Sequence, residues 1–84
     1  MAFNKSTITV PAGASVTMNF DNQESVPHNF ALYTNSSASS SIFVGTIITN
    51  TTTTYHFTAP STPGNYFFRC DVHPTAMTGT FVVT

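Results

Sequence analysis

The chain of 84 residues is long enough for one small domain, in which core burial alone gives a modest margin of stability. Only 6% of its residues are charged and its formal net charge is −1, which excludes the clustered basic surface that nucleic acid or an anionic membrane requires. One cysteine excludes an internal disulfide, and a hydrophobic content of 40% argues against a disordered chain. No apolar run is long enough for direct insertion of this domain into a membrane.

Short segments that alternate between polar and apolar residues follow one another along the chain, and no helical period interrupts them. Turn signals separate these segments, from Pro11-Ala12-Gly13 to the Pro- and Gly-containing loop of residues 59–64. The expected strands cover residues 6–10, 16–20, 28–33, 42–49, 52–58, 65–70 and 78–84. This spacing predicts an all-β fold, an antiparallel β-sandwich of about seven strands, with residues 1–84 in a single domain.

Four residues with metal-binding side chains lie in or beside two of the loops. Cys70 ends one expected strand, and His73 and Met77 follow it within one short loop. His28 stands at the head of an earlier strand, after the polar loop of residues 21–25. If the two loops lie at the same end of the sandwich, all four side chains converge there.

One thiolate, two imidazoles and one thioether are the donors of a mononuclear blue-copper site. The thiolate and the imidazoles hold copper in a trigonal plane, and the thioether takes a long, weak axial position. Soft sulfur suits Cu(I) and imidazole suits Cu(II), so the mixed set lets one electron come and go with little rearrangement. We therefore expect His28, Cys70, His73 and Met77 to bind one type 1 copper ion that cycles between Cu(II) and Cu(I).

Strand alternation predicts the orientation of Cys70 and of the third histidine, His56. Cys70 shares a strand face with Tyr66 and Phe68, and these large rings mark that face as the core side. The thiolate should therefore point into a dry, aromatic environment that protects sulfur from oxidation. His56 lies on the opposite face of its strand from its two aromatic neighbours and should be exposed to solvent.

With these motifs the chain resembles the cupredoxins of the plastocyanin and amicyanin type. The matching segments are Ile8-Thr9-Val10-Pro11-Ala12-Gly13, Pro27-His28-Asn29 and Gly64-Asn65-Tyr66-Phe67-Phe68-Arg69-Cys70-Asp71-Val72-His73-Pro74. The resemblance covers nearly the whole chain. It implies a Greek-key cupredoxin sandwich, a type 1 copper ion and an electron carrier that is not an enzyme.

The resemblance also implies roles for residues around the ligands. Asn29 would tie the strand of His28 to the backbone of Asp71 and so brace the thiolate. His73 would be the port through which electrons leave. The apolar docking patch around this port would consist of His73, Pro27, Pro74 and Ala76.

The resulting hypothesis is electron transport by a monomer that docks weakly, at its copper end, with a redox partner protein such as a cytochrome, an oxidase or a reductase. We expect an extracytoplasmic location (periplasm, cell surface or secreted), with any signal peptide or anchor lying outside this chain. The competing hypothesis is a copper storage or delivery module of a larger cell-surface protein, which would lose its metal on reduction. Enzyme activity is disfavoured, because a core-facing Cys70 would leave a substrate no path to the thiolate.

Overall fold

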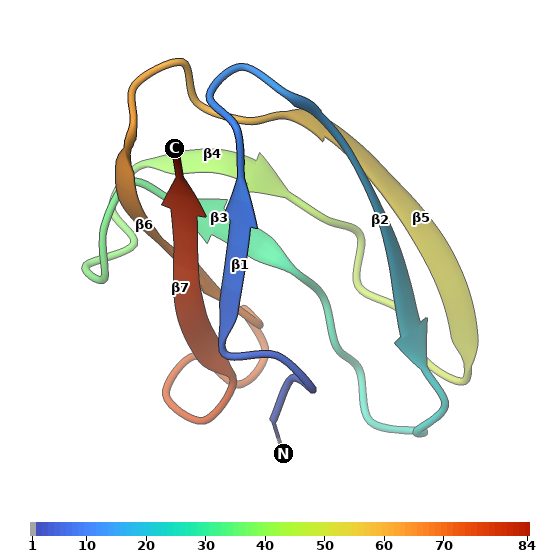
Figure 1. Ribbon diagram of the computed structural model, residues 1–84. Helices are drawn as coiled ribbons and strands as arrows, with labels where there is room; N and C mark the ends of the chain where they lie inside the picture. Colours follow the sequence, from blue (N-terminus) through green and yellow to red (C-terminus); the bar gives the residue numbers. More distant parts are fainter. Residues whose placement is uncertain (1) are drawn as a thin grey trace.

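The computed structural model describes residues 2–84, and these residues form two β-sheets that face each other around a shared core (Figure 1). The strands are β1 (Thr7–Val10), β2 (Ser15–Asn22), β3 (Ala31–Tyr33), β4 (Ser41–Val44), β5 (Thr51–Thr58), β6 (Gly64–Arg69) and β7 (Thr78–Val83). The larger sheet has the strand order β1-β7-β6-β3-β4, and the smaller one pairs β2 with β5. The predicted all-β sandwich is confirmed.

One pair of strands differs from the antiparallel expectation. β1 pairs with β7 in parallel, with Thr7 opposite Thr80 and Val10 opposite Val83, whereas the other strand pairs are antiparallel. β1 passes to the second sheet through the turn at Pro11, whose carbonyl accepts a hydrogen bond from the Ala14 amide at 3.2 Å. Because β1 and β7 are not joined by a hairpin, nothing forces them to run in opposite directions.

Two expected strands are shorter than their sequence pattern suggested. The segment expected to begin at His28 becomes a regular strand only at Ala31, and the segment expected to reach Thr49 ends at Val44. Between them the chain stays paired irregularly, since His28 and Ile48 exchange two backbone hydrogen bonds and the Gly45 amide donates to Phe30. A Cβ atom at Gly45 would lie 2.7 Å from the Phe30 carbonyl oxygen, so only glycine permits this close approach.

Aromatic side chains from both sheets fill the core. Phe30, Phe68 and Phe81 are almost fully buried, and the rings of Phe30 and Phe68 lie 5.3 Å apart. Phe68 on β6 also lies directly over Gly79 on β7, where the ring occupies the space that a Cβ would need. This packing fixes the two strands that flank the loop of residues 70–77.

The strand directions bring the two ligand-bearing loops to the same end of the sandwich. β2 and β6 both run toward the lower end of the molecule in Figure 1, where the loop after each strand lies. We call this end the ligand end; it carries residues 23–30 and 70–77. In residues 2–84, no helix has the length and apolar character needed to cross a membrane.

Candidate metal centre

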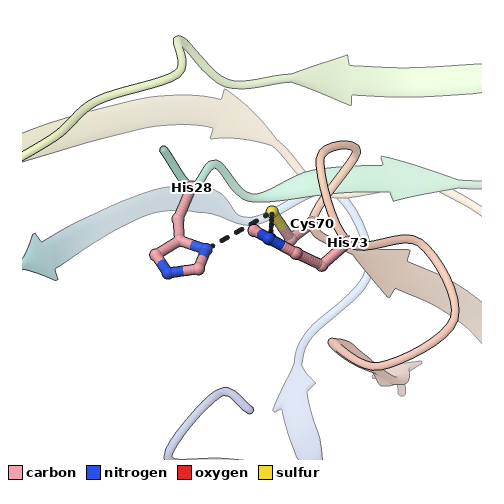
Figure 2. A group of neighbouring side chains, drawn as sticks. All are labelled: His28, Cys70 and His73. Carbon is pink, nitrogen blue, oxygen red and sulfur yellow. Dashed lines mark hydrogen bonds between the residues drawn. The ribbon is translucent and has the colours of Figure 1, made fainter. Parts of the chain in front are cut away.

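Three of the expected ligands meet at the ligand end of the sandwich. The Cys70 sulfur lies 3.8 Å from Nδ1 of His28 and 3.8 Å from Nδ1 of His73 (Figure 2). The potential ligand atoms of these three residues all lie within 4.8 Å of one another. Cys70 and His28 are buried and His73 is half-buried. The structure therefore brings together two imidazoles and one thiol at an edge of the core.

The spacing between these donors fits a single metal ion. In proteins, zinc, a first-row metal like copper, binds imidazole nitrogen at about 2.0 Å and thiolate sulfur at about 2.3 Å. With an angle of about 120° between the two bonds, these lengths separate the two donors by about 3.7 Å. Both sulfur–nitrogen distances here, at 3.8 Å, are close to that value. The donor atoms thus already lie where equatorial ligands of one ion need to be.

The ligand loop is held by its own backbone. The Cys70 amide donates to the Met77 carbonyl at 2.9 Å, and the His73 amide donates to the Cys70 carbonyl at 3.2 Å. The Met77 amide in turn donates to His73 at 3.1 Å. These three bonds close residues 70–77 into a compact turn in which the positions of Cys70, His73 and Met77 depend on one another.

Met77 is buried on the same side of the core as His28. The two side chains line one cleft between the sheets, together with Phe30 and Phe68. Met77 therefore lies beside the cluster, and a thioether is a donor that copper accepts.

A reciprocal pair of hydrogen bonds joins the two ligand-bearing segments. The Asp71 amide donates to Oδ1 of Asn29 at 2.8 Å, and Nδ2 of Asn29 donates to the Asp71 carboxylate at 3.1 Å. The same Nδ2 donates to the Gly45 carbonyl at 3.0 Å, and the Asn29 amide points at the Cys70 sulfur at 3.5 Å. We call this set of contacts the Asn29–Asp71 clamp. It fixes the thiolate relative to His28, which precedes Asn29.

Sequence reasoning missed two residues that complete the clamp. The Tyr33 hydroxyl donates to the Asp71 carboxylate at 2.5 Å, and Nε of Arg69 donates to the same oxygen at 3.0 Å. The Arg69 guanidinium lies 4.8 Å from the centre of the Tyr33 ring. Tyr33 reaches Asp71 because β3 pairs with β6, a contact between residues far apart in the sequence.

Burial and hydrogen bonding act in opposite directions on the pKa of Asp71. Partial burial raises the pKa of its carboxyl group, but the hydrogen bonds from Tyr33, Asn29 and Arg69 outweigh burial and hold this pKa below its usual value. Burial, followed by the bond to Asp71, raises the pKa of Tyr33. The protein therefore holds Asp71 as a carboxylate and Tyr33 as a neutral donor.

The remaining expected residues lie at the surface of the ligand end. Pro27 precedes His28, Pro74 and Ala76 follow His73, and all three are exposed, whereas His73 is half-buried. Val72, next to His73 in the loop, is 38% exposed and adds an apolar side chain that sequence reasoning did not include. His56 is exposed on β5, as strand alternation predicted, and lies outside the metal-binding cluster.

Comparisons with known proteins agree with this geometry. A family model for a cupredoxin-like domain matches residues 1–83. Auracyanin A, a "blue" copper protein from the green thermophilic photosynthetic bacterium Chloroflexus aurantiacus, is 29% identical, with a TM-score of 0.86 over 99% of this chain and 89% of its own.

Two further structures have the same fold. Auracyanin B is 20% identical, with a TM-score of 0.84 over 99% of this chain and 80% of its own. A reduced Cu(I) form of amicyanin is 25% identical, with a TM-score of 0.69 over 100% of this chain and 74% of its own. No curated sequence matches this chain significantly.

The clamp should behave as one coupled unit when the metal-free protein unfolds. Tyr33→Phe removes one donor to a charged acceptor, and Asp71→Asn removes the charge itself, so each should lower the free energy of unfolding by about 1.5–3 kcal/mol. The double variant should lower the free energy of unfolding by less than the sum of the two single decreases. The difference should be at least about 0.5 kcal/mol, because both changes remove the same hydrogen bond between Tyr33 and Asp71. Chemical denaturation of the four proteins measures this coupling.

Thr54→Val is the matched control. It removes an exposed hydroxyl that donates to Asn19, and we expect a change within about 0.5 kcal/mol. Strict additivity of Tyr33→Phe and Asp71→Asn would show that the two side chains do not act together.

Proposed function

This chain belongs to the cupredoxin-like family, and we propose that it carries single electrons at one type 1 copper ion. The observation that carries the proposal is the placement of two imidazole nitrogens, each 3.8 Å from one buried thiol. Its similarity to auracyanin A, a blue copper protein, supports copper as the metal. When bound, copper supplies a Cu(II)/Cu(I) couple that takes up one electron and releases one electron.

The four donors would have different tasks. His28 and His73 would bind the ion through Nδ1, and Cys70 would bind it through its thiolate. Met77 would contribute a weak fourth contact that would adjust the reduction potential without being needed to hold the ion. A set of one soft thiolate and two imidazoles serves both oxidation states, so neither state requires a new ligand.

The surrounding protein would keep this geometry the same in both oxidation states. The Asn29–Asp71 clamp holds the thiolate, and the backbone bonds of residues 70–77 hold His73 and Met77. Cys70 itself is fully buried, which keeps water away from its sulfur. Because the protein's own groups make these contacts, little energy should be needed to rearrange the ligands when an electron arrives.

We further propose that redox partner proteins dock weakly over His73. This residue links the buried cluster to a surface of exposed, small or apolar side chains at Pro27, Pro74 and Ala76. Such a surface allows a close approach without charge pairing, which suits a brief contact between a monomeric carrier and its partner.

Copper titration tests the ligand assignment. The unsubstituted protein should develop an intense blue thiolate-to-copper band with one equivalent of Cu(II), lose the band on reduction and regain it on reoxidation with the metal retained. Cys70→Ser should remove the band because a hydroxyl cannot replace the soft thiolate, while far-ultraviolet circular dichroism still shows β-sheet. Met77→Leu should keep the band and raise the potential, since Cu(II) loses a donor.

Two results would contradict this proposal in different ways. A blue band that survives Cys70→Ser would exclude Cys70 as the ligand. Release of copper on each reduction would instead favour a storage or delivery module over an electron carrier.

Electron self-exchange tests the docking surface. Ala76→Glu places a negative charge on both partners of a self-exchange encounter, so the rate should fall and become dependent on salt, while the blue band stays unchanged. Ser61→Glu adds the same charge in the loop between β5 and β6, at the opposite end of the sandwich, and should leave the rate nearly unchanged. Equal rates in the two variants would exclude the surface around His73 as the docking site.

A further inference from the structure

His28 uses both of its ring nitrogens. Nδ1 faces the Cys70 sulfur, and Nε2 lies on the far side of the ring, turned away from the cluster (Figure 2). There Nε2 lies 2.7 Å from Oε1 of Glu24. The side chain of His28 is 5% exposed, whereas the side chain of Glu24 is 61% exposed. Glu24 thus lies between a buried ligand and solvent, and no metal-binding pattern in the sequence pointed to it.

The two contacts select one form of the ring. A neutral imidazole carries its proton on one nitrogen and presents a lone pair on the other. Nδ1 must present the lone pair if it is to bind a metal beside the Cys70 sulfur, so the proton belongs on Nε2. There it is donated to the Glu24 carboxylate, which accepts but cannot donate. Glu24 therefore selects the tautomer of His28 that can bind metal.

The backbone of Glu24 is held from both sides. Its amide donates to Oδ1 of the buried Asn22 at 3.0 Å, and its carbonyl accepts a hydrogen bond from the Asn50 amide at 2.9 Å. Asn22 is fixed in turn, since its Nδ2 donates to the carbonyls of Val26 at 2.9 Å and Ile48 at 2.8 Å. Exposed ion pairs are usually weak, partly because two long side chains must be ordered. Here hydrogen bonds already hold the backbone of Glu24, so less of this residue has to be ordered when it contacts His28.

We propose that Glu24 is a positioning residue that holds the His28 ring in its metal-binding tautomer and orientation and stabilises Cu(II) relative to Cu(I). The inference rests on the proposed copper function. A carboxylate that accepts the second N–H of a ligating histidine makes the ring a stronger donor. Its negative charge also favours the more positive oxidation state. Glu24 would therefore lower the reduction potential of the bound copper.

The test compares Glu24→Gln and Glu24→Ala with the unsubstituted protein. Changes at such supporting residues typically cost about 10- to 100-fold in metal affinity. We expect Glu24→Gln, which keeps a neutral acceptor, to weaken Cu(II) binding about tenfold more than Cu(I) binding. For one electron this selective loss raises the potential by about 59 mV. Glu24→Ala, which removes the acceptor, should raise it further and lower the affinity for both ions.

Asp21→Asn is the matched control for charge. Asp21 is an exposed carboxylate near the same loop, and its hydrogen bonds are with Gln23 and Thr52. The control removes the same charge without touching His28, so the potential should stay close to that of the unsubstituted protein.

NMR of the metal-free protein tests the hydrogen bond between His28 and Glu24 directly. In the metal-free protein, the ring nitrogen NMR shifts of His28 should report a proton on Nε2, and in Glu24→Ala they should move toward a mixture of tautomers. Thermal unfolding of metal-free Glu24→Ala checks that the fold persists.

The outcomes separate this inference from the proposed function. A blue protein whose potential does not change in Glu24→Gln and Glu24→Ala would overturn the role of Glu24 alone. A shift in Asp21→Asn as large as in Glu24→Gln would show a general charge effect and overturn it as well. Absence of a blue band in the unsubstituted protein would overturn the proposed function, and the inference with it, whatever the His28 tautomer.

Discussion

The structure of the site depends on the hydrogen bonds between Asn29 and Asp71. His28 and Cys70 belong to segments 42 residues apart, and neither segment alone can fix the distance between imidazole and thiolate. The clamp joins the neighbours of both ligands through two reciprocal bonds, while the Asn29 amide points at the sulfur. Buried amide and carboxylate groups are costly unless they are paired, so the core tolerates Asn29 only in this arrangement. The same pairing that satisfies Asn29 therefore sets the geometry of the ligands.

Three of the five charged side chains of this chain lie beside the ligands. The sequence has only two basic and three acidic side chains. Arg69 and Asp71 pair with each other beside Cys70, and Glu24 contacts the outer nitrogen of His28. Elsewhere the surface is mostly neutral, rich in Ser, Thr and Asn. In the proposed electron carrier, charges fixed close to the ligands would support the metal site, whereas a surface for brief docking would not need them.

The sequence was sufficient for the fold class and for the donor types, because both rest on local patterns. Alternation predicted the buried faces of Phe68 and Cys70, and the short loop from Cys70 to Met77 places three donors together whatever the rest of the chain does. The missed features depend on pairing between distant segments. Tyr33 reaches Asp71 only because β3 lies beside β6, and the parallel pairing of β1 with β7 has no local signal. Glu24 contacts His28 because the side chain of Asn22 shapes the loop between them, which composition alone does not reveal.

The central claim is that the polypeptide, and not the metal, holds the ligands in place. Amide hydrogen exchange in the metal-free protein tests this claim most directly, at the amides of Cys70 and Asp71. The Cys70 amide donates to the Met77 carbonyl at 2.9 Å, and the Asp71 amide donates to Oδ1 of Asn29 at 2.8 Å. The account predicts that both amides are strongly protected without metal and gain little further protection when Cu(I) is bound. Exchange at the rate of an unstructured peptide without metal, with protection only after copper is added, would show that the metal organises the site and would contradict the account.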